Sequence, residues 1–238
     1  VIEANPRASR TVPFVSKSTG VPLAKIAARI MAGEKLADLH LPADDREFDY
    51  FCVKEAVMPF GRFPGSDVVL GPEMKSTGEV MGIAGNFPAA FTKTQLAIDY
   101  EPPRGGEVFI SVNDGDKRNI TAIARSIARV GFSLVATTGT ARALRASGIE
   151  CEEVGKIHAG SHTILDRIAS GEIVLMINTP FGSSTNTDGY EMRAACVRHG
   201  VSYCTTLAGA QALIAGMEAV RETGLDVIAL QDLPQWEG

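Results

Sequence analysis

Beyond residue 106, short apolar runs alternate along the chain with longer segments whose apolar residues recur at helical spacing. Val108–Val112, Phe132–Ala136 and Ile173–Ile177 are rich in β-forming residues and predict strands. The third run is apolar throughout, which is typical of a strand buried on both faces of a sheet. Helices are predicted at 119–130, 140–147, 191–199 and 207–222. A last strand is predicted at Val227–Leu230. Strands that alternate with helices predict a doubly wound parallel sheet of the α/β class.

The first hundred residues have a less regular pattern. Tyr50–Met58 is rich in β-forming residues and stops before Pro59, so it predicts a strand. Two helices are predicted, one from Pro22 to about Gly33 and an amphipathic one over Phe87–Ile98. Val1-Ile2 is typical of a strand end. Segments without a periodic pattern are predicted to be irregular: 6–20, 41–48 and 61–71.

Asp99–Gly106 separates these two patterns. It contains two prolines and two glycines, a composition that stiffens and then interrupts the backbone. We therefore place a domain boundary in this segment. The prediction is a first domain over residues 1–98, a linker over 99–106 and a second domain over 107–238.

Polar residues follow three predicted strands, at the edge of a parallel sheet where ligands bind. After the second strand, Thr137-Thr138-Gly139-Thr140 opens a helix whose amides, hydroxyls and dipole favour a phosphate. Lys117 follows the first strand, and Asn178-Thr179 follows the apolar strand. Lys156 adds a second positive charge. The alternative is a plain capped helix start, since Thr is common at that position, and both interpretations stay open on the sequence.

A second candidate site opens the chain at Glu3-Ala4-Asn5-Pro6-Arg7. Glu3 and Asn5 alternate along the predicted strand, so their side-chain oxygens point to one face and suit Mg²⁺. Arg7 can reach a phosphate oxygen with its planar guanidinium. The spacing alone favours an ordinary strand end before a proline turn, because short polar patterns are common. We also expect that Val1 is not the natural start, since no Met precedes it.

The bulk composition is that of an ordinary soluble protein, with 45% hydrophobic and 21% charged residues. A net charge of −5 argues against nonspecific binding to nucleic acid or to an anionic membrane. No apolar run reaches the roughly 18 residues of a membrane-spanning helix. The four cysteines form no C-x-x-C pair, so free thiols in the reducing cytoplasm are expected. His158 and His162 are interpreted as loop residues rather than as a metal-binding pair.

Several longer runs carry a resemblance to one known family. They are V-I-E-A-N-P-R-A-S-R-T-V-P-F-V-S-K at 1–17, V-K-E-A-V at 53–57, F-P-G at 63–65 and the highly specific G-P-E-M-K-S-T-G-E-V-M-G at 71–82. Over essentially its whole length, the chain resembles the C-terminal portion of the large subunit of carbamoyl phosphate synthetase. The resemblance implies that residues 1–98 end the second ATP-grasp unit and that the rest forms an allosteric domain of the methylglyoxal synthase-like fold.

Enzymes of that family make carbamoyl phosphate from bicarbonate, glutamine-derived ammonia and two ATP, with a glutaminase small subunit, for arginine and pyrimidine biosynthesis. The resemblance implies that Glu3 and Asn5 hold the Mg²⁺ or Mn²⁺ that bridges the ATP phosphates and that Arg7 faces the phosphoryl group. It also implies that Glu55 and Thr205 bind the activator ornithine. The residues implied for the phosphate and ribose of UMP or IMP are Lys117, Thr137, Thr140, Lys156, Asn178 and Thr179.

Two departures from the family pattern leave the identity of the nucleotide open. Pro180 replaces a threonine of the nucleotide-regulated bacterial enzymes, and residues 181–187 lack their arginines. Three functions are therefore weighed: a part of the synthetase that is inactive alone, an anion-binding regulatory module without catalysis, and a free-standing methylglyoxal synthase. The third requires an acidic catalytic residue beside the phosphate loop, which His158–His162 does not offer, so it is disfavoured.

Overall fold

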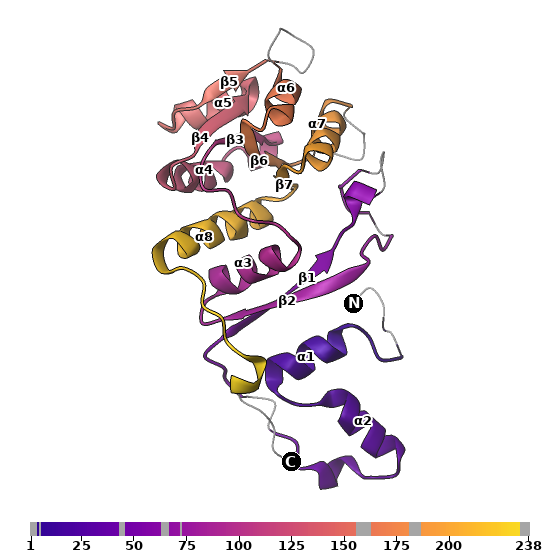
Figure 1. The fold of residues 1–238 in the computed structure, drawn as a ribbon. Coiled ribbons are helices and arrows are strands. Elements are labelled where there is room, and N and C mark those ends of the chain that lie inside the picture. Colours follow the sequence, from indigo (N-terminus) through magenta and orange to yellow (C-terminus); the bar gives the residue numbers. More distant parts are fainter. Residues whose placement is uncertain are drawn as a thin grey trace.

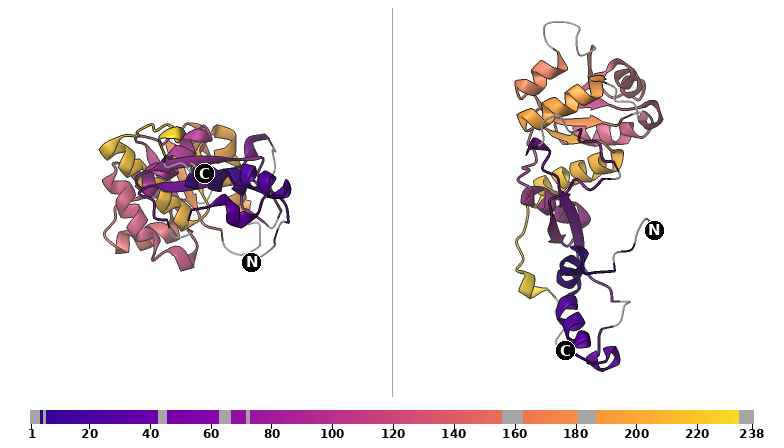
Figure 2. Two further views of the ribbon diagram at one scale, coloured as in Figure 1. Left: turned by 90° about the horizontal axis from the view of Figure 1, so that it is seen from below. Right: turned by 90° about the vertical axis from the view of Figure 1, so that its right-hand side faces the viewer.

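The molecule is elongated and is built from two different kinds of sheet. The computed structural model describes residues 4, 6–42, 46–62, 67–71, 73–155, 163–180 and 187–233. In Figure 1, a five-stranded sheet with its helices forms one end, a two-stranded hairpin lies in the middle, and helices α1 (Thr11–Thr19) and α2 (Leu23–Met31) form the other end. Figure 2 shows the same order from the side. For brevity, residues before 99 are called the first half and residues after 106 the second half.

The second half contains the doubly wound parallel sheet that the sequence predicts. Its strands run in the spatial order β5-β4-β3-β6-β7, and every neighbouring pair is parallel. The strands are β3 (Glu107–Ser111), β4 (Ser133–Thr137), β5 (Glu152–Val154), β6 (Ile173–Asn178) and β7 (Ser202–Cys204). The sequence pattern predicts the three inner strands. The two edge strands have three residues each, too few to show a periodic pattern.

Helices cover both faces of this sheet. Helices α4 (Ile120–Arg129), α5 (Thr138–Ala146) and α8 (Leu207–Thr223) share one apolar core, whereas α6 (Ile164–Ala169) and α7 (Thr187–His199) share the other. Along β3, Val108 and Ile110 face the first core and Phe109 faces the second. All three side chains are at most 1% exposed. Burial of such a side chain stabilises the fold by about 1.5–3 kcal/mol, which explains why the central residues of the inner strands are apolar.

The first half is built on an antiparallel hairpin of β1 (Phe51–Val57) and β2 (Gly78–Ala84), with helix α3 (Phe87–Ala97) packed against it. The predictions of β1, α2 and α3 are confirmed. The sequence pattern does not predict β2, because two of its seven residues are glycine. Gly82 is required there, since a Cβ atom at this position would overlap the carbonyl oxygen of Ala90 in α3.

Two predictions of local structure are wrong. Residues 6–20 are not irregular throughout, because α1 occupies Thr11–Thr19. Pro13 lies in the first turn of this helix, where a missing amide hydrogen breaks no helical hydrogen bond. Val227–Leu230 is not a strand: Val227 is 97% exposed and only a short 3₁₀ turn, η4, follows. The 3₁₀ turns are η1 (Leu36–Leu39), η2 (Phe60–Arg62), η3 (Asp114–Asp116) and η4 (Leu230–Asp232).

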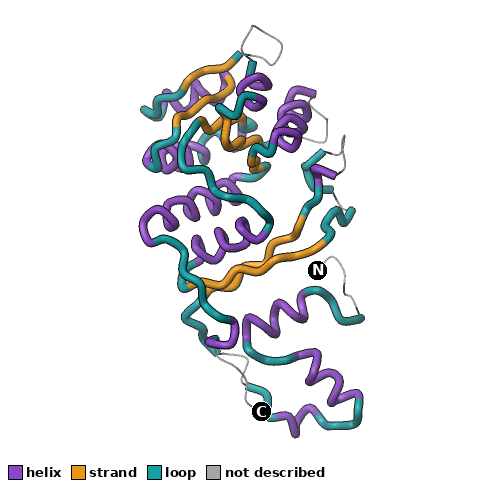
Figure 3. The backbone as a smooth tube through the Cα atoms, viewed as in Figure 1, coloured by secondary structure: helices purple, strands orange, loops and turns teal. Residues whose placement is uncertain are grey.

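Helix α8 belongs to the second half in sequence but packs against α3 of the first half, as Figure 3 shows. The two helices approach closely at Gly216, where a Cβ atom would overlap the hydroxyl of Thr92 and stand 3.4 Å from the carbonyl oxygen of Pro88. After α8 the chain turns back, and Leu225 packs against the small apolar cluster of Ala84, Ala89 and Ala90. The two halves are therefore joined by packing as well as by the linker.

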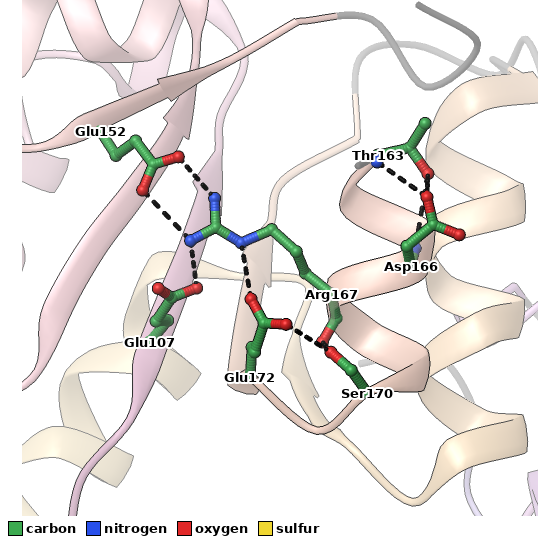
Figure 4. Close-up of polar contacts among 7 residues, drawn as sticks. All are labelled: Glu107, Glu152, Thr163, Asp166, Arg167, Ser170 and Glu172. Carbon is green, nitrogen blue, oxygen red and sulfur yellow. Dashed lines mark hydrogen bonds and ion pairs between the residues drawn. The ribbon is translucent and has the colours of Figure 1, made fainter. Parts of the chain in front are cut away.

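A buried arginine ties α6 to the edge of the sheet where the strands begin (Figure 4). The guanidinium of Arg167, a residue 4% exposed, lies 2.5 Å from Glu107, 2.7 Å from Glu152 and 3.5 Å from Glu172. Glu107 and Glu152 begin β3 and β5, so the cluster lies at the opposite edge from the predicted phosphate site. Hydrogen bonding to Glu152 raises the pKa of Arg167, and the cluster serves to hold the helix in place.

None of the helices in the described part of the chain combines the length and the apolar character needed to cross a bilayer.

Candidate functional site

A cavity lies where β3, β4 and β6 end, and it is called the strand-end cavity below. Its volume is about 300 Å³. Its walls come from the end of β4, the end of β6 and the first turn of α7, and the lining includes Thr137, Thr138, Gly139, Asn178, Asp188 and Gly189. These are the strand ends at which the sequence predicts a phosphate site. Thr137 and Asn178, two of the predicted residues, lie together in this lining.

The turn from β4 into α5 presents backbone amides to this cavity. Helix α5 begins at Thr138, directly after the strand, and the side chain of Thr137 makes no capping hydrogen bond. The first N–H groups of the nine-residue helix therefore receive no capping hydrogen bond from Thr137 and can donate to a ligand. The positive end of the helix dipole points to the same cavity. A Cβ atom at Gly139 would stand 2.9 Å from Nζ of Lys117, so the ammonium lies next to this turn. Lys117 also pairs with Asp114 at 2.5 Å.

Thr140 and Thr179, which are also predicted site residues, have a supporting position. Thr140 is 1% exposed, and its hydroxyl accepts a hydrogen bond from the amide of Val112 at 3.3 Å. The hydroxyl of Thr179 accepts hydrogen bonds from the amide and the side chain of Asn113 at 3.1 and 3.0 Å. Among the described residues, neither threonine belongs to the cavity lining. Their hydroxyls instead hold the backbone that follows β3.

Several predicted residues lie outside the described part of the chain. They are Glu3, Asn5 and Lys156, together with His158 and His162. Arg7 is described: it is exposed, and its guanidinium donates a hydrogen bond to the neighbouring carbonyl of Ala8 at 3.3 Å. Its role toward a phosphoryl group therefore stays a prediction.

Arg193 of α7 is a buried residue of this region that the sequence does not single out. It is 5% exposed, and its Nη1 donates to Oδ1 of Asn178 at 2.8 Å. Its Nε and Nη2 donate to the two carboxylate oxygens of Asp67 at 2.8 and 2.6 Å. Asp67 belongs to the first half, and its hydrogen bonds to Arg193 hold the pKa of its carboxyl below its ordinary value. The sequence predicts 191–199 only as a helix, and nothing in its pattern marks one arginine as buried.

A larger cavity of about 610 Å³, called the junction cavity below, lies between the two halves. Glu55 of β1 and Thr205, which follows β7, both line it, as do Val68, Tyr203 and Cys204. The carboxylate of Glu55 accepts hydrogen bonds from Thr94, at 2.6 Å, and from Gln95. The two residues implied for ornithine, far apart in sequence, therefore share one cavity.

Burial sets the protonation of the groups around the junction cavity. Burial raises the pKa of Tyr203 to about 12, and it raises the pKa of the Cys204 thiol to about 12, with the carboxylate of Glu55 as a further cause. Cys196 also has a pKa raised to about 12 by burial. Both cysteines are free. Because their pKa values are raised, the two thiols are neutral near pH 7 and act as packing groups.

Comparison with known proteins finds similarity to one family. Residues 119–205 match the family model described as the MGS-like domain, and residues 1–39 match that of the carbamoyl-phosphate synthase L chain, ATP binding domain. The chain is 51% identical over 238 residues to "Carbamoyl phosphate synthase large chain, C-terminal section" of Methanopyrus kandleri, covering 98% of this chain and 44% of the relative. Along almost its whole length, the chain is similar to the large chain of carbamoyl phosphate synthase.

Full-length members of the family are much longer than this chain. It is 48% identical over 232 residues to the large chain of Myxococcus xanthus, which covers 98% of this chain and 21% of the relative. A methylglyoxal synthase structure from Elizabethkingia anophelis NUHP1 has 18% identity and a TM-score of 0.39, over 47% of this chain and 78% of that chain, a likeness too weak to add to the assignment. The family models and the parallel sheet assign the fold: an ATP-grasp remnant followed by an α/β MGS-like domain.

Proposed function

We propose that the chain is the C-terminal part of the large chain of a glutamine-hydrolysing carbamoyl phosphate synthase. The observation that carries the proposal is an identity of about 50% to such large chains along 98–100% of this chain. Because the chain spans only 21–22% of the full-length relatives, the reaction belongs to a longer assembly. That assembly would form carbamoyl phosphate from bicarbonate, glutamine-derived ammonia and two ATP, for arginine and pyrimidine biosynthesis.

Each predicted domain is assigned its own role. Residues 1–98 form the end of an ATP-grasp unit, 99–106 form the linker and 107–238 form the effector domain. The match of residues 1–39 to an ATP-binding model supports the first assignment. In it, Glu3 and Asn5 would ligate Mg²⁺ or Mn²⁺ on the ATP phosphates and Arg7 would face the phosphoryl group. A carboxylate and an amide oxygen are fitting ligands for these hard cations.

The second half is proposed to bind the phosphate and ribose of UMP or IMP in the strand-end cavity. The free amides of α5, the nearby ammonium of Lys117 and the side chains of Thr137 and Asn178 support this role. Asp188 also lines the cavity, and its carboxylate would repel a bound anion. Positive charge near the cavity, such as that of Lys117, is therefore needed to offset this repulsion. Lys156, Thr140 and Thr179 are assigned to the same site from the family pattern.

Ornithine is proposed to bind in the junction cavity. The carboxylate of Glu55 offers a partner for one of its ammonium groups, and Thr205 lines the same cavity from the second half. The intact large chain is proposed to work in the cytoplasm with a glutaminase small subunit. Four free cysteines fit that reducing compartment.

Two measurements test the proposal. Titration calorimetry of the 238-residue chain with UMP and IMP is expected to show saturable binding of at least one nucleotide. An assay for carbamoyl phosphate is expected to detect no product from this chain alone with ATP, bicarbonate and ammonia. Absence of binding by both nucleotides would remove the effector assignment, and product formation would contradict the assignment to one part of a larger enzyme.

A free-standing methylglyoxal synthase is not favoured, because the relatives are large chains of carbamoyl phosphate synthase.

A further inference from the structure

Residues 67–71 of the first half lie between the two cavities. Asp67 contacts Arg193, beside the strand-end cavity. The next residue, Val68, is 4% exposed and lines the junction cavity together with Leu70. Asp67 is therefore joined through the backbone to a residue in the wall of the junction cavity.

Arg193 divides its donors between the two halves. Two of its nitrogens donate to Asp67, and the third donates to Asn178, whose own amide nitrogen donates to the carbonyl of Ser111 at 3.1 Å. Asn178 has no charge, so the ion pair of Arg193 at this site is with Asp67. A guanidinium that is almost fully buried needs such a partner, because an unpaired buried charge is strongly destabilising.

The guanidinium lies directly behind the lining of the strand-end cavity. Gly189 and Asn178 belong to that lining. A Cβ atom at Gly189 would stand 3.0 Å from Nη1 of Arg193 and 3.6 Å from Oδ1 of Asn178. Gly189, which has no side chain, thus brings the cavity lining within contact distance of the guanidinium, although Arg193 itself is not among the described lining residues.

We propose that an anionic ligand in the strand-end cavity competes with Asp67 for Arg193 and thereby loosens the wall of the junction cavity formed by Val68 and Leu70. The inference rests on the proposed function, which supplies the anion as the phosphate of UMP or IMP. As Arg193 turns toward the anion, its hydrogen bonds to Asp67 weaken. Thermodynamic linkage requires the reverse effect as well, so a weaker Asp67–Arg193 contact must raise the affinity for the anion.

The substitution Asp67→Asn tests this competition in the 238-residue chain. It removes the negative charge that neutralises Arg193 while keeping the shape of the side chain, and Asp67 does not line the strand-end cavity among the described residues. Calorimetry with UMP and IMP is expected to show binding about three- to ten-fold tighter than in the unmutated chain. The matched control is Asp226→Asn, because Asp226 also joins the halves, through Lys93 at 3.2 Å, but away from this cavity. The control is expected to change affinity less than two-fold, within the small effect of an exposed ion pair.

Hydrogen exchange on the unmutated chain provides a second readout that needs no variant to fold. The amide of Val69 donates to Asp67 at 3.2 Å, so saturating nucleotide is expected to speed exchange at 68–71. Unchanged or weaker affinity in Asp67→Asn, equal tightening in both variants, or exchange at 68–71 that stays the same or slows would overturn the competition. If neither nucleotide binds the unmutated chain, the effector assignment and this inference fall together; if a nucleotide binds and only the coupling is missing, the inference alone is wrong.

Discussion

Glu55 and Thr205 line the same cavity, although Glu55 lies in β1 of the antiparallel hairpin and Thr205 directly follows β7 of the parallel sheet. The cavity exists because α8 packs against α3 and brings the end of β7 toward β1. A ligand that bridges these residues would stabilise one arrangement of the two halves. This relationship makes the junction cavity a natural place for regulation of the neighbouring ATP-grasp unit.

The charge of Glu55 is predicted to matter for ornithine. Glu55→Gln keeps the size of the side chain but removes the negative partner of an ammonium group. Loss of one charge-assisted hydrogen bond of roughly 1.5–3 kcal/mol would weaken ornithine about 10- to 100-fold in calorimetry. Glu79→Gln on β2 is the matched control, because Glu79 pairs with Lys54 and is not part of the cavity lining among the described residues. Equal affinity in Glu55→Gln and the unmutated chain would contradict the assignment.

Removal of the Lys117 ammonium beside the turn from β4 into α5 is predicted to weaken nucleotide binding. Lys117→Ala should reduce the affinity for UMP about 10-fold or more, because one charge-assisted contact of roughly 1.5–3 kcal/mol is lost. Lys156→Ala carries the same expectation from the family pattern. The exposed Lys25 of α2 provides the control, and Lys25→Ala should bind UMP like the unmutated chain. A Lys117→Ala chain with unaltered affinity would exclude this lysine from the site.

Close packing of α8 on α3 is predicted to depend on Gly216. Gly216→Ala would place a methyl group against Thr92, and overpacking of this kind costs about 1–3 kcal/mol of unfolding free energy. Urea denaturation followed by circular dichroism measures the loss. Gly85→Ala is the control, because a Cβ atom at Gly85 meets nothing within 4 Å. If the urea midpoints of unfolding fell equally in both variants, the close approach of α8 to α3 would not be the reason that position 216 requires glycine.

The Asp67–Arg193 pair predicts a pH dependence of stability. The pKa of Asp67 is lowered in the folded state, so its contribution is present above the ordinary pKa of 3.8 and is lost as the pH falls through the lower folded value. Asp67→Asn is therefore expected to lower the unfolding free energy at pH 7, and this loss should become smaller as the pH falls below 3.8. An equal loss at pH 7 and below pH 3.8 would mean that the charge of Asp67 does not contribute.

The sequence predicts the inner strands and most helices because their apolar residues repeat with the period of the element, as at Ile173–Ile177. It misses β2 because the glycine at position 82 is needed for contact with α3 rather than for strand formation. For the site, Thr137 and Asn178 are predictable because they directly follow the predicted strands Phe132–Ala136 and Ile173–Ile177. Arg193 is not, since its burial results from a contact with Asp67 that is distant in sequence.

Effector binding in the strand-end cavity can be followed residue by residue, by amide NMR of the isotopically labelled chain titrated with UMP and IMP. We predict saturable shifts at Thr138 and Gly139, which begin α5, and at Asn178. The coupled segment 68–71 is expected to shift as well, whereas Gln95 of the junction cavity is expected to change little. The absence of saturable shifts, or shifts confined to the junction cavity, would contradict the account.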